Sequence, residues 1–421
     1  MPFGFYIIMA AQFFSALADN ALLIAAIYAL HEMQSPLWFD PMLKLLFTVS
    51  YVVLAGFVGA FADSMAKGKV MLISNTIKIG GCLMVFMGMH PLLGYAIVGL
   101  GAATYSPAKY GILTELLPHR LLVVANGWIE GLTVLAIILG TVAGGALINP
   151  AIAQALLSFD MPIIETPIDS VLESSLFIIT GIYVLAALFN LYIPNTGVDH
   201  VPLSLRPGHL FHEFNHCLKL LWRDKLGQIS LATTTLFWGA GATLQFIVIR
   251  WAADALGYDL GQASMLQGVT AIGVAAGAAM AARMITLRKS VRVIPMGIAM
   301  GFVVMLMNFV TSFWAAVPLL IIIGALSGFF VVPMNALLQH RGHILMGAGH
   351  SIAVQNFNEN LAILVMTGLY AVMIWANFSI YTVIVTFGLF VAGTMYLVKR
   401  RFEANQRIHD DASHLDDNCC H

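Results

Sequence analysis

Long apolar stretches follow one another along almost the whole chain, and short polar stretches separate them. A membrane-spanning helix needs about 20 mostly apolar residues, and by that measure the pattern predicts about twelve spans. The first stretch carries Asp19 and no small-residue cleavage site follows it, so we expect a retained helix and not a signal peptide. The expected spans are 4–30, 42–64, 70–88, 92–117, 122–148, 175–193, 228–253, 262–284, 292–310, 314–338, 347–373 and 377–398.

Basic residues gather in every second loop and in the tail after the last span, whereas the alternate loops are mainly acidic. Because cytoplasmic loops carry the excess of Lys and Arg, this asymmetry predicts an even number of spans with both termini in the cytoplasm. The basic set comprises Lys67, Lys69, Arg120, Arg206, Lys219, Arg223, Lys225, Arg283, Arg288, Lys289, Arg292, Arg341, Lys399, Arg400, Arg401 and Arg407.

A polar stretch divides the chain into two halves that resemble each other. Pro107 is followed by Asn126 and Glu130 on one helical face, and Pro333 is followed in the same way by Gln355 and Glu359. Duplicated halves are typical of transporters, whose site lies between them. We therefore expect an all-α membrane protein with two pseudo-symmetric six-helix bundles. The expected parts are an N-terminal bundle at 1–193, a cytoplasmic linker lying amphipathically on the membrane surface at 194–227, a C-terminal bundle at 228–401 and a cytoplasmic tail at 402–421.

Composition narrows the function. Of 421 residues 60% are apolar and 10% charged, whereas average soluble domains have about 25% charged residues. The net charge of −1 argues against a nucleic-acid partner. The four cysteines fit neither a disulfide framework nor a metal site, and the chain has no catalytic serine elbow, zinc-protease motif or phosphate-binding loop. We expect no cofactor and no metal, and a secondary transporter in place of an enzyme.

A short segment between the second and third predicted spans has the composition of a gate at the cytoplasmic face. Gly59 allows helices to approach closely, and Asp63 can sit at the positive end of a neighbouring helix. Lys67 and Lys69 hold the turn that follows. This arrangement resembles the signature loop of the major facilitator superfamily, although Ser64 stands where that loop usually has a basic residue.

Ionisable and amide side chains inside predicted spans are the candidate substrate-binding residues, because such groups are costly in a membrane. Asp19 paired with Arg250 is an alternative, purely structural interpretation, and Lys78 is expected to reach toward the cytoplasmic surface. Arg250 and Lys109 would bind a phosphate, and the carboxylates an ammonium group. The candidates are Asp19, Asn20, Lys109, Asn126, Glu130, Gln245, Arg250, Asn335, Gln355, Asn356 and Glu359.

Several long blocks together resemble the bacterial lysophospholipid transporter family of the major facilitator superfamily, over residues from about 5 to about 400. Members of that family can carry an arginine where Gln245 stands, and here the arginine is Arg250, five residues later. The blocks are AQFFSALADNALL at 11–23, YSPAKYGIL at 105–113, ANGWIE at 125–130, FWGAG at 237–241, FFVVPMNALLQ at 329–339 and AVQNFNEN at 353–360.

This resemblance implies a flippase of the bacterial inner membrane that brings lysophosphatidylethanolamine and lysophosphatidylglycerol to the cytoplasmic leaflet. There a separate acyltransferase/acyl-carrier-protein synthetase, its functional partner, would re-acylate them. We expect a monomer surrounded by membrane lipid. The alternative is a cation-coupled exporter of amphipathic drugs, with Asp19 or Glu130 as the proton carrier. A membrane-embedded acyl-transfer enzyme is a third possibility, for which the sequence offers no catalytic His–Asp pair.

Overall fold

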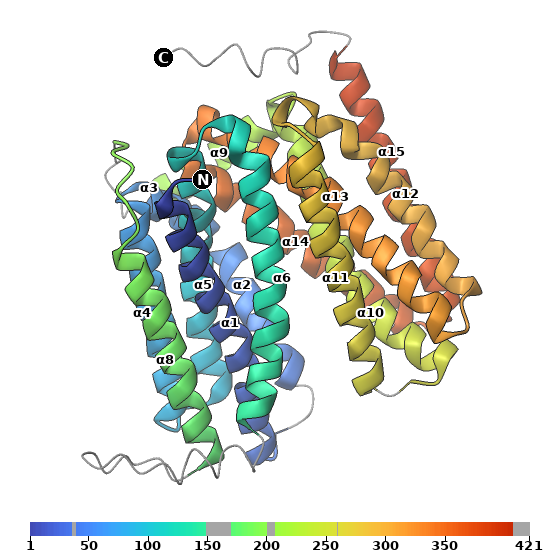
Figure 1. Ribbon diagram of the computed structural model, residues 1–421, viewed down its shortest axis with the longest axis horizontal. Helices are drawn as coiled ribbons and strands as arrows, with labels where there is room; N and C mark the ends of the chain where they lie inside the picture. The colour runs from blue at the N-terminus through green and yellow to red at the C-terminus, as the bar shows by residue number, and fades with distance from the viewer. Residues whose placement is uncertain (36–38, 149–169, 200–206, 259, 407–421) are drawn as a thin grey trace. The chain divides into compact units, whose positions relative to one another are not determined.

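The computed structural model describes residues 1–35, 39–148, 170–199, 207–258 and 260–406. These residues form helices joined by short connections, and the described part of the chain contains no strand. They divide into two compact units (Figure 1). Unit 1 comprises Met1–Leu116, Leu135–Phe214 and Ala348–Ala353, and unit 2 comprises Leu117–Val134, Asn215–Gly347 and Val354–His421.

Unit 1 is built around a long first helix. Helix α1 packs along α8, and α8 also packs along α4, which in turn lies against α5 (Figure 1). The second predicted span is broken at Leu54, where the two pieces meet at 64°. The helices that contribute to unit 1 are α1 (Phe3–Glu32), α2 (Phe39–Val53), α3 (Ala55–Asp63), α4 (Lys67–Phe86), α5 (Pro91–Leu116), the latter part of α6 (Leu122–Leu147), α8 (Val171–Leu191) and the start of α9 (Pro207–Arg223).

Unit 2 contains two pairs of closely packed helices. Helix α11 packs along α13, and α12 packs along α15, while α10 contacts both α13 and α15. Its helices are the early part of α6, the remainder of α9, α10 (Gly227–Leu256), α11 (Leu260–Met284), α12 (Ile294–Met305), α13 (Phe313–Met346), most of α14 (Ala348–Trp375) and α15 (Ile380–Gln406), with short 3₁₀ turns η1 (His119–Leu121), η2 (Leu287–Val293) and η3 (Leu306–Phe309).

The predicted spans coincide with these helices, which confirms an all-helical membrane fold. Among the described residues, nine helices are long and apolar enough to cross a membrane, or ten if the bent pair α2 and α3 is one span. The remaining predicted spans, 92–117 and 262–284, coincide with α5 and α11, which are rich in glycine and alanine. The count of twelve is therefore consistent with the structure.

Small residues allow α11 and α13 to approach closely. Gly277 of α11 faces the backbone of Ala325, so that a methyl group at position 277 would collide with the Ala325 carbonyl oxygen. Gly328, on the same helix as Ala325, faces the backbone of Val274 in the same way. Lipid tails are as apolar as side chains, so close backbone packing and not water exclusion holds such helices together.

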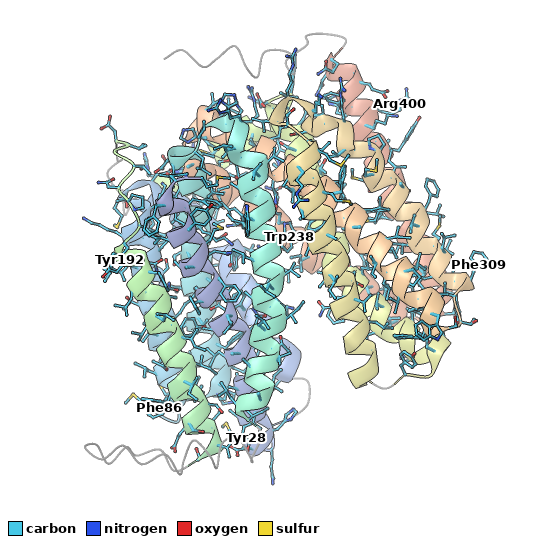
Figure 2. The ribbon with its side chains drawn as sticks, in the orientation of Figure 1. Tyr28, Phe86, Tyr192, Trp238, Phe309 and Arg400 are labelled. Atoms are coloured by element: carbon cyan, nitrogen blue, oxygen red, sulfur yellow. The ribbon has the colours of Figure 1, made fainter. Side chains whose placement is uncertain are left out.

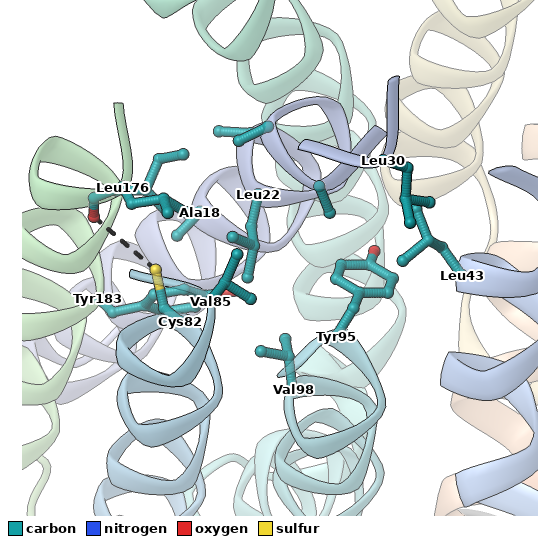
Figure 3. Close-up of a cluster of buried hydrophobic side chains, with 14 residues drawn as sticks. Ala18, Leu22, Leu30, Leu43, Cys82, Val85, Tyr95, Val98, Leu176 and Tyr183 are labelled. Carbon is teal, nitrogen blue, oxygen red and sulfur yellow. Dashed lines mark hydrogen bonds between the residues drawn. The ribbon is translucent and has the colours of Figure 1, made fainter. Parts of the chain in front are cut away.

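A buried apolar cluster fills unit 1 between α1, α4, α5 and α8 (Figure 3). Leu22 of α1 and Val98 of α5 are fully buried in it. The thiol of Cys82 lies 3.7 Å from the carbonyl oxygen of Leu176, which links α4 to α8. The cluster adjoins the polar side chains described below, because Tyr183 belongs to both.

The outer surface of each unit is apolar, as a protein surrounded by lipid requires. Tyr192 is 72% exposed and Phe309 is 82% exposed (Figure 2). Many other large apolar side chains are exposed on the membrane-spanning helices of both units. The chain is therefore a multi-pass membrane protein.

The expected amphipathic linker contains one helix, α9. Its buried side chains Leu210, Phe214, Cys217 and Leu221 recur every three or four residues, which places them on one face. Phe211, which lies outside that face, is 75% exposed. The linker boundaries and the four-part division remain predictions, and most of the predicted tail, from residue 407 onward, lies outside the described residues, as do Arg206 and Arg407.

Candidate functional site

A buried ion pair occupies the middle of α1 and α4 in unit 1. The Lys78 Nζ atom lies 2.7 Å from Asp19 Oδ2, and the Lys78 and Asp19 side chains are 2% and 14% exposed. Lys78 also donates to Ser15 Oγ at 3.0 Å. The phenol of Tyr183 in α8 donates to Asp19 Oδ1 at 2.7 Å. Both carboxylate oxygens are therefore engaged, which compensates part of the several kcal/mol that it costs to bury each charge.

Amide and aromatic groups complete this Asp19 cluster, which we define as Ser15, Asp19, Asn75, Lys78 and Tyr183. Ser15 Oγ donates to Asn75 Oδ1 at 2.7 Å. Asn75 Nδ2 is buried and has no hydrogen-bond partner among the described residues. A donor of this kind is costly unless something accepts from it, so the cluster has capacity for one more acceptor.

The expectation for Lys78 is wrong, and Asp19 and Arg250 each have an ion-pair partner inside their own unit. Lys78 does not reach toward a membrane surface but is the partner of Asp19, and its ammonium also lies 5.1 Å from the centre of the Tyr105 ring. Arg250 instead pairs with Asp254, one helical turn along α10, at 3.2 Å. The role of Lys78 as the partner of Asp19 was not predicted from the sequence. Its signal there is that Ser74, Asn75 and Lys78 form a polar stripe on one face of an otherwise apolar helix.

A second polar cluster lies in unit 2 and consists of Asn335, Gln355 and Glu359. Gln355 Nε2 donates to Glu359 Oε1 at 2.7 Å and to Asn335 Oδ1 at 3.1 Å. All three side chains are at least 94% buried. The Gln355 Oε1 atom has no partner among the described residues, so this Glu359 cluster also has an unused polar atom. The structure thus brings together three predicted residues from α13 and α14.

A reciprocal amide pair joins α6 to α13. Asn126 donates to Gln339 Oε1 and Gln339 donates to Asn126 Oδ1, both at 2.9 Å. Asn126 is fully buried and Gln339 is 1% exposed. Because each amide satisfies the other, this pair is best explained as helix-to-helix attachment in unit 2.

The remaining candidate residues are not gathered into these clusters by their described contacts. Asn20 donates to the Ala16 carbonyl at 2.8 Å, within its own helix. Lys109 is half-buried and lies 4.2 Å from the centre of the Tyr110 ring. Asn356 is buried in α14, and its carbonyl oxygen accepts from Asn360 Nδ2. The side chain of Glu130 lies outside the described residues.

Gln245 and Arg250 are both exposed on α10, and the Arg250 side chain is 57% exposed. The Gln245 backbone carbonyl accepts a hydrogen bond of 2.7 Å from Gln267 of α11. Five residues correspond to about 140° around a helix, so the two side chains cannot occupy equivalent places.

The predicted gate residues converge in unit 1. Asp63 accepts hydrogen bonds from the backbone N–H groups of Gly349 and His350, at 2.8 and 3.0 Å, at the start of α14. This confirms the expectation that Asp63 sits at a helix N-terminus, where the dipole favours an anion. Lys67 lies 2.6 Å from Asp63 Oδ1, while Lys69 is exposed.

We call this group the Asp63 cluster; its members are Gly59, Asp63, Lys67, Glu115, Gly349 and His350. Its helices are closely packed. A methyl group at Gly59 would lie 3.0 Å from Ala353 Cβ, as expected of a small residue at a helix contact. Sequence reasoning missed two members. His350 Nδ1 lies 2.6 Å from Asp63 Oδ2, and Glu115 lies 3.4 Å from Lys67 Nζ. The signal for His350 was its place at the start of an expected span.

No group of three or more His, Cys, Asp or Glu side chains that could hold a metal ion occurs among the described residues. What the clusters offer is a set of charges and amides on transmembrane helices. Such an arrangement can bind a polar group and hold it away from hydrocarbon, which is the requirement for moving an amphipathic solute across a membrane.

The model of the Major Facilitator Superfamily matches residues 8–366. The chain is 44% identical over 368 residues to the lysophospholipid transporter LplT of Yersinia pestis strain Pestoides F, covering 87% of this chain and 86% of that protein. LplT of Yersinia pseudotuberculosis serotype I strain IP32953 matches to the same extent.

Solved structures share the fold at low sequence identity. The human organic anion transporter MFSD10 (TETRAN) superposes with a TM-score of 0.72 at 14% identity, covering 96% of this chain and all of that one. The transporter FucP in the outward conformation gives a TM-score of 0.71 at 15% identity, covering 95% and 98%.

Proposed function

This chain belongs to the Major Facilitator Superfamily, and on that premise we propose that it carries lysophospholipids across the bacterial inner membrane. The observation that carries the proposal is the 44% identity to curated lysophospholipid transporters along 87% of the chain. The substrates are lysophosphatidylethanolamine and lysophosphatidylglycerol, which the protein flips to the cytoplasmic leaflet. The loop charges support an orientation with both termini in the cytoplasm.

The two polar clusters supply the chemistry that a lysophospholipid headgroup needs. Lys78 of the Asp19 cluster binds the phosphate, and Asp19 accepts from the ammonium or glycerol hydroxyl groups. The unpartnered Asn75 amide donates to a headgroup oxygen. Glu359, with Gln355 and Asn335, forms a second polar station in the other unit. Lys109, Asn126, Glu130 and Arg250 remain proposed contributors, as do Asn20, Gln245 and Asn356.

The Asp63 cluster acts as the gate. Asp63 and Gly59 hold the start of α14 against the end of α3 when this contact is made, and Lys67 pairs with Asp63. Lys69 remains a proposed part of the turn that follows. Breaking the contact releases both helix ends, so it is suited to a conformational change that exposes the site alternately.

A separate cytoplasmic acyltransferase/acyl-carrier-protein synthetase re-acylates the lipids delivered. The protein acts as a monomer within the membrane lipid.

The test is uptake of radiolabelled lysophosphatidylethanolamine in a bacterial strain that lacks its own lysophospholipid transporter. The wild-type chain should restore uptake, and Asp19→Asn and Glu359→Gln should abolish it while membrane insertion is unchanged. Glu403→Ala is the matched control, because Glu403 is 51% exposed and pairs with Lys399 one turn away. Drug resistance without any lysolipid uptake would reject the proposal and favour the cation-coupled drug exporter.

A further inference from the structure

A pocket with a cavity volume of about 120 Å³ opens between α10, α14 and α15 in unit 2. Its floor is formed by Ile247, Val383 and Phe387, which are at least 93% buried. Its rim includes Leu369 and Phe390, which are 56% and 44% exposed. None of the clusters described above contributes a residue to it.

The lining is apolar even where the sequence has hydroxyl groups. Thr243 Oγ1 donates to the Gly239 carbonyl and Thr386 Oγ1 donates to the Thr382 carbonyl, each at 2.9 Å. Both hydroxyls therefore donate to their own helix backbone and do not need a polar group of a ligand as acceptor. Met366 and Met373 also line the pocket, and methionine adapts its shape to flexible ligands.

A pair of opposite charges stands beside one end of this pocket. Tyr370, a lining residue, stacks on Phe246 and its hydroxyl donates to the Phe246 carbonyl at 3.4 Å. Arg250 follows Phe246 by one helical turn, so the two lie on one face of α10. Arg250 Nε lies 3.2 Å from Asp254 Oδ2, and both side chains are more than one-third exposed.

An apolar slot with a cation and a carboxylate at its end has the shape and charge order of a one-chain phospholipid. We propose that this pocket is a binding station separate from the Asp19 cluster: it binds a segment of the single acyl chain of the lysophospholipid, with the phosphate at Arg250 and the ammonium or hydroxyl groups at Asp254. At roughly 30 Å³ for a group the size of a water molecule, such a space takes about four carbons. It therefore holds a segment of one acyl chain.

This inference rests on the proposed function and deepens it. An acyl chain gains little by moving from lipid tails into an apolar pocket, because both surroundings are equally free of water. The pocket therefore acts through fit and not through hydrophobic affinity. Its consequence is a preference for chain number and chain length, which a headgroup site alone would not produce.

The experiment compares uptake of lauroyl, palmitoyl and stearoyl lysophosphatidylethanolamine by variants that change only the pocket volume. Thr386→Phe fills the rim and should lower palmitoyl uptake by about tenfold relative to lauroyl uptake, as overpacking of a filled space does. Met373→Ala enlarges the pocket and should favour the stearoyl lipid. Leu389→Phe is the matched control, because Leu389 is 54% exposed and does not line the pocket.

A second measurement does not depend on the variants folding. A palmitoyl lysophosphatidylethanolamine carrying a diazirine in its acyl chain should label peptides of α14 and α15 in the wild-type protein. Unlabelled lysolipid should prevent labelling and phosphatidylcholine should not. Equal competition by phosphatidylcholine would assign the pocket to ordinary bilayer lipid and overturn the inference.

The outcomes separate this inference from the function on which it rests. If the wild-type protein takes up no lysolipid of any chain length, the proposed function fails. If the wild-type protein takes up lysolipid, but Thr386→Phe lowers the uptake of all three lipids equally or behaves like Leu389→Phe, the acyl pocket is rejected and the proposed function stands. Arg250→Gln should lower uptake of all three lipids alike, since it alters the headgroup end.

Discussion

Replacing Lys78 by methionine tests whether the Asp19 cluster is held together by charge. Lys78→Met keeps most of the side-chain volume and removes the ammonium that lies 2.7 Å from Asp19. The carboxylate is then left buried without its cation, while the Tyr183 phenol still donates to it at 2.7 Å. Breaking a buried ion pair by removing one partner costs about 3–5 kcal/mol of unfolding free energy. We expect that loss for Lys78→Met.

The double variant Asp19→Asn/Lys78→Met distinguishes the charge from the shape of the site. It removes both charges and keeps both volumes, and replacing a whole buried pair by neutral groups is often close to neutral for stability. The double variant should therefore be more stable than Lys78→Met alone, although it carries one more substitution. Its uptake of lysophospholipid should still be lost, because both headgroup contacts are gone.

The assay is thermal unfolding of the purified protein in detergent. The quantity measured is the fraction of protein that remains monodisperse after heating. Lys69→Met is the matched control, since Lys69 is an exposed lysine on the same helix; a surface change of this kind stays within about 0.5 kcal/mol. A double variant that melts at or below the temperature of Lys78→Met would refute the reasoning, because the two charges would then not be coupled.

Three further predictions follow from other contacts. Asp63→Ala leaves two N–H groups at the start of α14 without their acceptor and should abolish uptake while lowering the melting temperature only modestly, as measured on the same purified protein. Gly277→Val should prevent folding, seen as loss of the monodisperse peak, because the position faces the Ala325 carbonyl and has no room for a side chain. Asn126→Leu should destabilise by about 1–3 kcal/mol through the stranded Gln339 amide, and thermal unfolding of the Asn126→Leu/Gln339→Leu double variant should show part of that loss recovered.

Features that depend on local chemistry could be predicted from the sequence. The apolar runs locate the helices, because a span is a property of about 20 consecutive residues. Asp63 could be expected at a helix N-terminus, because a carboxylate after a glycine-containing helix end has few other favourable places. Which helix supplies that N-terminus could not be predicted, since Gly349 lies 286 residues further along the chain.

The partner of Asp19 could not be predicted for the same reason. Lys78 is 59 residues away on a helix whose rotation the sequence does not define. A lysine in a membrane span has a long side chain that can reach toward the membrane surface. The packing of α1, α4 and α8 turns Lys78 inward. The break at Leu54 could not be predicted from the sequence either, because the residues on both sides of it are apolar and form one continuous predicted span.

Charge compensation within unit 1 restricts how a headgroup can bind. Asp19 is already neutralised by Lys78, so an incoming ion must exchange partners and does not meet a bare charge. A lone anion taken by Lys78 would strand Asp19, and a lone cation taken by Asp19 would strand Lys78, each at a cost of about 3–5 kcal/mol. A headgroup with a phosphate and an ammonium replaces both partners at once and leaves no charge uncompensated. A phosphate with glycerol hydroxyls does the same for Lys78 and still gives Asp19 donors. If the Asp19 cluster is the headgroup site that we propose, this exchange of partners favours phospholipid headgroups over simple ions and over drugs that carry a single positive charge.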